Sequence, residues 1–166
     1  MQRTFSAQTE ADQESLYEVM ADLGTYPSWL DVVDRVESAS DGDGDGDGDG
    51  DGPAWIITLR ARIGPLARSK RLRMVRTVAD GHQVRFERRE LDGRDHSRWV
   101  LSALVESFDE EPWRSRVELD LDYGGSLWSG LLDGVLQAAA DGATRRLQEH
   151  VAARVSPGEG ESATGR

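Results

Sequence analysis

The chain of 166 residues contains no cysteine, only three histidines and a single lysine, Lys70. The absence of cysteine excludes a disulfide framework, a thiolate metal site and a cysteine nucleophile. No stretch reaches the roughly 18 apolar residues of a membrane-spanning helix, and the first residues lack the apolar core of a signal peptide. The sequence therefore predicts a cytoplasmic protein with no stable membrane insertion.

The net charge of −11 comes partly from one low-complexity segment, the six Asp-Gly units from Asp41 to Gly52. Without these six acids the net charge is −5, which is still unfavourable for binding the phosphates of a nucleic acid. The repeat has no apolar residue, which predicts a flexible insertion in a hairpin over 41–52. Its first half is similar to a calcium-binding loop, but the twelfth position is Gly52 where a bidentate Glu is required, so we predict no metal site.

Periodicity predicts a single α+β domain over residues 1–155 and a disordered tail over 156–166. A strand over 3–8 is followed by a helix over 11–23. After an aromatic-proline elbow around Tyr26 and Pro27, a helical turn runs from Trp29 to Val33. An extended segment begins at Val36. Alternating residues then predict antiparallel strands over 54–63, 69–79, 84–89, 96–108 and 113–123, and an apolar stripe predicts a long helix from Leu127 to about Val155.

The alternation gives the sheet one dry face. Its expected inward residues are Trp55, Ile57, Leu59, Ala61, Ile63, Leu72, Met74, Val78, Val84, Phe86, Trp99, Leu101, Ala103, Val105, Trp113, Val117, Leu119, Leu121 and Tyr123. Charged residues share this face, since Arg76 follows Met74 and Arg88 follows Phe86 at a spacing of two. If the loop between the two strands has three residues, 80–82, both strands keep the inward residues given above. If the turn has only two residues, one strand exchanges its faces, and Arg73 faces inward in place of Arg76.

The elbow Asp22-Leu23-Gly24-Thr25-Tyr26-Pro27-Ser28-Trp29-Leu30, with this order of elements, resembles the START-like helix-grip (SRPBCC) superfamily. Within it, the chain resembles the polyketide cyclase/dehydrase and lipid-transport group that includes coenzyme Q-binding proteins. The resemblance implies a curved antiparallel sheet of about seven strands around a long C-terminal helix, with two short helices after the first strand. It also implies an apolar cavity that holds a lipid, a polyketide or a quinone-like molecule, without a cofactor.

The first functional hypothesis is therefore binding or carriage of a hydrophobic small molecule. Arg88 is expected to anchor a polar end of this ligand or to pair with Glu90. The residues expected to line the cavity are Trp29, Trp55, Ile57, Leu59, Met74, Phe86, Arg88, Trp99, Leu101, Val117, Leu119, Leu131 and Val135.

Two alternatives remain at this stage. A polyketide aromatase/cyclase needs a group that moves protons in the cavity, such as Arg88 or Glu90, because His82, His96 and His150 are expected at the surface. No catalytic residue is predicted. The other alternative is a protein-interaction module that docks an acidic partner on arginines of the outer sheet face. These arginines are Arg60, Arg62, Arg71, Arg73, Arg85 and Arg89.

Overall fold

The computed structural model of the chain describes residues 2–39, 52–63, 66–124 and 142–155. The Asp-Gly units up to Asp51, the tail from Ser156 and the first part of the predicted last helix lie outside the described residues. Leu131 and Val135, two expected cavity residues, belong to that part. No helix in the described ranges has the length and apolar character needed to cross a bilayer.

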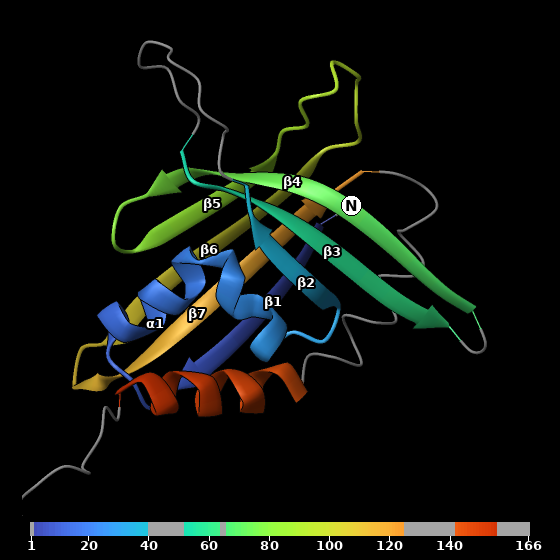
Figure 1. Cartoon of the computed structure of the whole chain (residues 1–166). Helices are drawn as coiled ribbons and strands as arrows, with labels where there is room; N and C mark the ends of the chain where they lie inside the picture. Colours follow the sequence, from blue (N-terminus) through green and yellow to red (C-terminus); the bar gives the residue numbers. More distant parts are fainter. Residues whose placement is uncertain (1, 40–51, 64–65, 125–141, 156–166) are drawn as a thin grey trace, which may run out of the picture.

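Seven antiparallel strands form one curled sheet in the order β1-β7-β6-β5-β4-β3-β2 (Figure 1). Strands β2 to β7 form a meander, and β1 pairs with β7 to complete the sheet. The prediction of an antiparallel sheet of about seven strands is confirmed. The strands are β1 (Gln2–Thr9), β2 (Val33–Ser38), β3 (Ala54–Ile63), β4 (Leu66–Ala79), β5 (Gln83–Arg88), β6 (Trp99–Phe108) and β7 (Glu111–Tyr123).

Two short helices follow β1. Helix α1 (Gln13–Ala21) begins after Asp12, whose Oδ1 accepts a hydrogen bond from the Ser15 backbone N–H at 2.8 Å. The 3-10 helix η1 (Leu23–Ser28) begins in the same way, because Asp22 accepts a hydrogen bond from the Gly24 N–H at 2.8 Å. Side-chain acceptors at these positions satisfy N–H groups that have no partner within the helix.

The second helix is the elbow itself, so the prediction of a helical turn from Trp29 to Val33 is wrong. Val33 already begins β2 and lies opposite Leu59 of β3. The Arg60 N–H of β3 donates to the Val32 carbonyl at 2.8 Å, so the chain begins to pair with β3 here despite the helical spacing of its apolar residues. The Thr25 hydroxyl donates to the Val19 carbonyl at 2.8 Å and fixes η1 against the end of α1.

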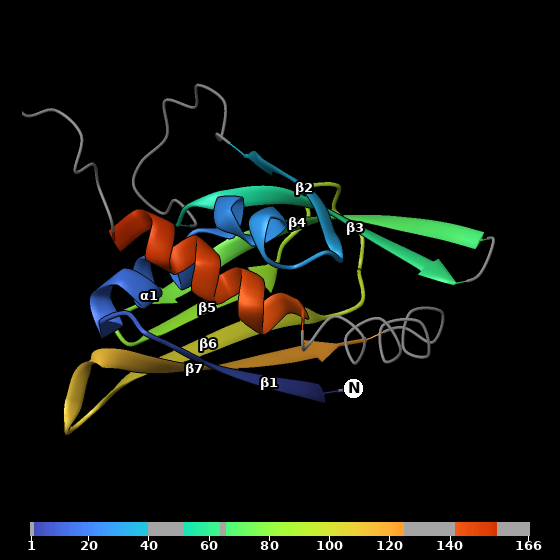
Figure 2. The ribbon, with the colours of Figure 1, turned by 90° about the horizontal axis from the view of Figure 1, so that it is seen from below.

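Both short helices and the helix over residues 142–155 lie on one face of the sheet (Figure 2). In the last helix, Ala143, Leu147 and Val151 recur every four residues and are buried in the core. This spacing places all three on one side of a helix, as predicted for Leu147 and Val151. The sheet and these helices therefore enclose a single hydrophobic core.

The loop between β4 and β5 has three residues, as one of the two predicted turns requires. Asp80, Gly81 and His82 separate the strands, and Gly81 has a φ of +89°, a conformation that favours glycine. Leu72, Met74, Val84 and Phe86 are all buried, as predicted. A β-bulge between Arg76 and Val78 then places Val78 opposite Arg85. Val78 therefore faces the outer side, and its inward assignment is wrong because the extra residue reverses the alternation.

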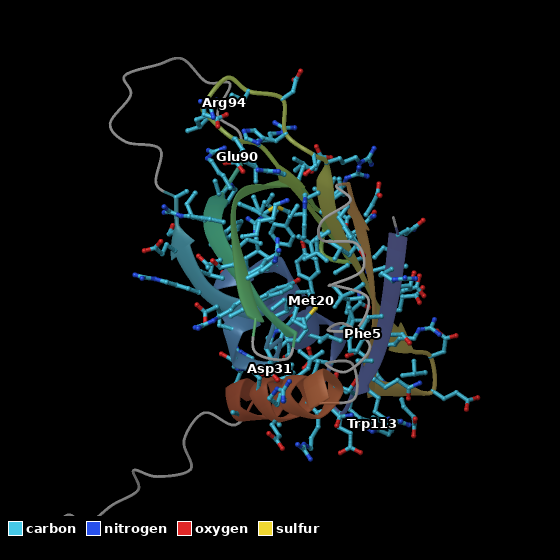
Figure 3. The ribbon with its side chains drawn as sticks, turned by 90° about the vertical axis from the view of Figure 1, so that its right-hand side faces the viewer. Phe5, Met20, Asp31, Glu90, Arg94 and Trp113 are labelled. Carbon is cyan, nitrogen blue, oxygen red and sulfur yellow. The ribbon has the colours of Figure 1, made fainter. Side chains whose placement is uncertain are left out.

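Trp113 is the second inward residue that the structure corrects, because 61% of its surface is exposed. The residue lies near the end of the β6–β7 hairpin, away from the interior around Met20 (Figure 3). Strand β1 ends at Thr9, opposite Ser115, so β1 does not extend alongside Trp113. Alternation predicts which side of a strand a residue faces, but not whether that side is covered.

Candidate functional site

The concave side of the sheet contains a cavity of about 60 Å³. Strands β2, β3, β4, β6 and β7 contribute to its wall, and η1 and the residues after it close one side. Apart from the Tyr26 hydroxyl and the indole N–H of Trp99, the lining side chains have no polar atom. The lining residues are Leu23, Tyr26, Leu30, Val32, Val33, Ile57, Leu59, Met74, Trp99, Leu101 and Leu121.

Five of the expected cavity residues line this space, namely Ile57, Leu59, Met74, Trp99 and Leu101. The others that the structure describes lie elsewhere. Trp29, Phe86, Val117 and Leu119 are buried in the core, and half-buried Trp55 packs against it, with its ring centroid 5.6 Å from that of Phe86. Strand alternation identifies inward residues but cannot separate those beside the cavity from those packed in the core.

The remaining wall comes mainly from the elbow and the start of β2. Leu23, Tyr26, Val32 and Val33 line the cavity although the sequence did not predict it, because their place beside the cavity depends on how η1 and β2 pack against the distant strands. Leu30, at the end of the elbow, also lines the cavity. The apolar character of all five residues was visible in the sequence, and only the extended path of Val33 was not.

Tyr26 and Trp29 hold the elbow in place. Their ring centroids are 4.6 Å apart, and the Tyr26 hydroxyl donates to the Met20 carbonyl at 3.1 Å. Burial raises the pKa of Tyr26 far above its ordinary value, so the phenol remains a neutral donor. Because this hydroxyl is bonded to α1, Tyr26 presents a largely apolar ring to the cavity.

Arg88 is almost completely enclosed by protein groups, with 9% of its side chain exposed. Its Nε donates to Glu90 at 2.7 Å, and its Nη1 donates to the carbonyl and hydroxyl of Ser97 at 3.2 and 3.3 Å. Its Nη2 lies 3.2 Å from Nδ1 of His96. Of the two roles expected for Arg88, the structure shows the internal pair with Glu90, and Arg88 is not among the residues that line the cavity.

The histidines do not converge on the cavity. His82 contacts Gln13, and His96 lies 2.8 Å from Asp92, whose pKa the histidine lowers. His150, on the last helix, has a lowered pKa because of its partial burial. None of the three lines the cavity, and the described residues contain no group of three His, Asp or Glu side chains that could hold a metal ion.

Most of the outer arginines described are paired with acids. Glu37 contacts Arg71 at 3.5 Å, and Glu87 contacts Arg85 at 2.9 Å and Arg89 at 3.7 Å. Arg60 lies 3.8 Å from Asp34. The side chain of Arg62 lies outside the described residues. The positive charge of this face is therefore largely balanced by neighbouring carboxylates.

Arg73 is not part of an exposed outer face, contrary to the expectation. It is 5% exposed, and its Nη1 donates to the Arg89 carbonyl at 3.1 Å. The Arg89 N–H in turn donates to the Arg73 carbonyl at 3.0 Å. The chain that follows β5 therefore covers Arg73, an arrangement that strand alternation alone does not predict.

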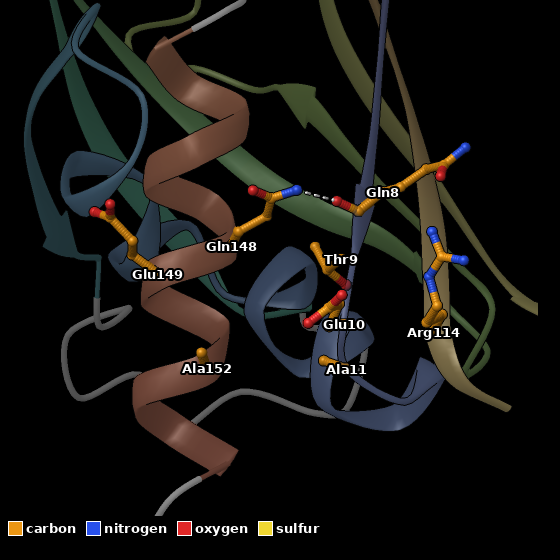
Figure 4. A pocket seen from close by; sticks show the side chains of 8 residues that line it. All are labelled: Gln8, Thr9, Glu10, Ala11, Arg114, Gln148, Glu149 and Ala152. Carbon is orange, nitrogen blue, oxygen red and sulfur yellow. Dashed lines mark hydrogen bonds between the residues drawn. The ribbon is translucent and has the colours of Figure 1, made fainter. Parts of the chain in front are cut away.

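A second hollow, a polar groove of about 530 Å³, separates the end of β1 from the last helix (Figure 4). The Gln148 side chain crosses it and donates to the Gln8 carbonyl at 2.8 Å. Six of its eight lining residues have polar or charged side chains, so water competes with any ligand there. The groove is lined by Gln8, Thr9, Glu10, Ala11, Arg114, Gln148, Glu149 and Ala152.

Solved structures match this arrangement over nearly the whole chain. The protein TTHA0849 from Thermus thermophilus has a TM-score of 0.66 at 20% identity, covering 94% of this chain and 100% of that one. A START superfamily protein from Mycobacterium smegmatis has a TM-score of 0.64 at 12% identity, covering 92% and 98%. This chain has the START-like helix-grip fold. The ZhuI aromatase/cyclase from Streptomyces sp. R1128 shares it, with a TM-score of 0.63, 13% identity and coverage of 97% and 99%.

These identities show the fold and not the activity. Proteins with the helix-grip fold generally bind hydrophobic ligands, but the fold hosts several functions. No protein-family model matches the sequence, and the search of curated proteins found no match. The function of this helix-grip protein therefore has to be argued from its own residues.

Proposed function

We propose that this protein binds a hydrophobic small molecule, such as a lipid, a polyketide or a quinone-like compound, on the concave side of its sheet. The observation that carries the proposal is the cavity walled by eleven residues, nine of them without any polar side-chain atom. An apolar wall favours an apolar ligand because binding removes hydrocarbon surface from water, at about 0.8 kcal/mol for each buried CH₂ group.

The cavity has to enlarge when such a ligand binds. Its 60 Å³ is well below the roughly 300 to 1,000 Å³ of typical small-molecule pockets. Met74 has an unbranched, adaptable side chain that can change rotamer. Leu30 lies in the connection between η1 and β2 and is only half-buried. Movement of these two side chains is our proposed route to a larger site.

Native mass spectrometry of the full chain after incubation with a cell lipid extract tests the proposal. The unmodified protein is expected to retain a hydrophobic compound. Leu121→Trp, which fills the cavity from β7, is expected to abolish retention. Leu104→Trp, at an exposed position on neighbouring β6, serves as the matched control and is expected to leave retention unchanged. Retention by none of the proteins, or equal retention by all three, would overturn the proposal.

The alternative, a polyketide aromatase/cyclase, has the likeness to ZhuI in its favour. It has less support from the site, because Arg88 and Glu90 are bonded to each other and neither lines the cavity. Docking of an acidic partner on the outer arginines is weakened in a similar way by their neighbouring carboxylates. Binding of a hydrophobic molecule is therefore the function that we favour.

A further inference from the structure

We propose that the ligand carries an anionic head group and that Lys70 binds this group at one end of the apolar cavity. The inference rests on the proposed function and specifies its ligand class. Lys70 is the only lysine of the chain, and it lies on β4 directly opposite Leu59 of β3. Residues directly opposite in an antiparallel pair face the same side of the sheet, so Lys70 shares the concave side with cavity-lining Leu59.

Trp99 connects Lys70 to the cavity. The ammonium nitrogen of Lys70 lies 5.0 Å from the centroid of the Trp99 ring, and Trp99 itself lines the cavity. This contact stabilises a cation over the face of the indole. The positive charge is therefore held beside the apolar wall.

The charge of Lys70 is not neutralised by an ion pair. Among the described residues, no carboxylate lies within ion-pair distance of its ammonium group. The acid whose charge acts on Lys70 is Glu90, and Glu90 is bonded to Arg88 at 2.7 Å. Glu90 therefore pairs with Arg88 and not with Lys70. Desolvation and the charge of Arg88 both lower the pKa of Lys70, and an anion bound beside the ammonium group would stabilise its charged form.

Trp99 provides an independent indication of a polar ligand atom. The residue is 2% exposed, and its indole N–H is buried without a hydrogen-bond acceptor among the described residues. A buried donor without an acceptor is costly and is usually satisfied in native proteins. An oxygen of a head group bound by Lys70 could accept this hydrogen bond. Trp99 therefore contacts the Lys70 ammonium group with its ring and offers its indole N–H as a neutral hydrogen-bond donor.

Carboxylates and phosphate monoesters share the chemistry that this site would recognise, because both place anionic oxygens on an ammonium group. The site thus predicts an amphipathic ligand with an apolar body and an acidic end. Arg88, by contrast, has its guanidinium nitrogens occupied by Glu90, Ser97 and His96. Lys70 is the better candidate for the anchoring role expected of Arg88.

Isothermal titration calorimetry with four ligands of the same chain length tests this assignment. The probes are tetradecanoate, tetradecyl phosphate, tetradecanol and tetradecylammonium, each used below its micelle concentration. We expect the unmodified protein to bind one or both anions at least about tenfold more tightly than the alcohol, and the ammonium compound most weakly. A preference for only one anion identifies the head group.

Lys70→Met is expected to reduce the preference for anions to within about twofold, because it weakens the binding of the two anions far more than that of tetradecanol. Arg71→Met is the matched control, because Arg71 is the next residue of the same strand and its exposed side chain contacts Glu37 on the outer face. This control is expected to keep the full preference. Trp99→Phe, which keeps a ring and removes the donor, is expected to weaken anion binding more than alcohol binding.

The outcomes separate the two proposals. If the alcohol binds as tightly as the anions, or if Lys70→Met keeps the preference, the assignment of Lys70 is wrong while hydrophobic binding stands. If none of the four ligands binds to the folded protein, hydrophobic binding fails with it. Circular dichroism of each variant confirms that the protein is folded before it is titrated.

Discussion

The apolar cavity and the polar groove both lie between the sheet and helical elements, but different interactions hold their walls. Around the cavity, Tyr26, Met74 and Trp99 are buried and packed together with the core. Across the groove, the Gln148 side chain bonds to the Gln8 carbonyl, and Glu10 and Glu149 are exposed. The groove is thus larger than the cavity but more accessible to water. Volume alone therefore does not identify a ligand site, since the free energy gained by burying an apolar ligand depends on an apolar wall that excludes water.

This comparison predicts that substitutions in the packed core cost most and that substitutions in the groove cost least. Trp29→Ala is expected to have the largest effect. Trp29 is fully buried beside Tyr26. Removing a buried aromatic side chain leaves a cavity and lowers the free energy of unfolding by about 3 to 5 kcal/mol. Urea denaturation followed by circular dichroism measures the loss.

Trp113→Ala is the control for this measurement, because it makes the same substitution where 61% of the residue is exposed. Its effect is expected to stay within about 0.5 kcal/mol. Similar losses in the two variants would show that the β6–β7 hairpin is covered in solution, for example by a second molecule.

The second prediction concerns the charged end of the concave face. Arg88→Met removes the charged partner of Glu90 and leaves the carboxylate only the hydrogen bond from the Arg73 backbone N–H at 3.3 Å; the side chains of Arg88 and Glu90 are 9% and 21% exposed. We expect a loss on the order of 2 kcal/mol, less than the roughly 3 to 5 kcal/mol of a fully buried pair. Arg85→Met, which breaks the more exposed pair with Glu87, is expected to cost less than about 1 kcal/mol.

A double-mutant cycle with Glu90→Gln tests whether the loss comes from the unpaired carboxylate. If it does, the double variant is more stable than Arg88→Met alone. If the losses of the two single variants simply add, Arg88 acts through Ser97 and His96 and not through Glu90.

The third prediction is pH-dependent. The hydrogen bond from the Ser15 backbone N–H lowers the pKa of Asp12 in the folded protein. The stability that Asp12 contributes is therefore complete above the unfolded-state pKa of about 3.9 and is lost as the pH falls through the lower folded-state pKa. Asp12→Ala is expected to cost about 1 kcal/mol at neutral pH.

Asp12→Asn keeps a capping acceptor but does not titrate, so it separates the cap from its charge. The difference in unfolding free energy between the unmodified protein and this variant is expected to shrink as the pH falls below about 4. A difference that stays constant between neutral pH and about pH 3 would contradict the assigned role of the carboxylate. Thermal unfolding at several pH values provides the measurement.

Much of the fold could be predicted because its determinants are local. The alternation in β3, β5 and β7 and the elbow before Trp29 each depend on a short stretch of sequence. The errors arose where a distant element decides the outcome. Trp113 has the correct alternation but lies beyond the end of β1, Val78 follows a bulge, and Val33 is extended because β3 pairs with it.

The same distinction applies to the site. Ile57, Leu59 and Trp99 could be named because their strands were correctly assigned, and Lys70 shares the face of Leu72 and Met74 by the same alternation. The sequence therefore contained a signal for Lys70, although Arg88 was the cation expected in the cavity. The bonds that occupy Arg88 and the missing acceptor of Trp99 depend on how separate strands meet, which no short stretch of sequence specifies.

The smallest expected effect lies in the groove. Gln148→Ala removes the hydrogen bond to the Gln8 carbonyl, and because the side chain is exposed we expect a loss near the lower end of the range for hydrogen bonds, about 0.5 kcal/mol. Glu149→Ala is the matched control on the next residue of the same helix, since the Glu149 side chain makes no hydrogen bond or ion pair among the described residues. Hydrogen exchange of the amides over residues 142–155 reports the local effect, and we expect faster exchange in Gln148→Ala than in Glu149→Ala.

Equal exchange in the two variants would mean that packing of Ala143, Leu147 and Val151 alone holds the helix against the sheet. A loss comparable to that of Trp29→Ala would instead mean that the polar contact stabilises the fold as strongly as the packed core.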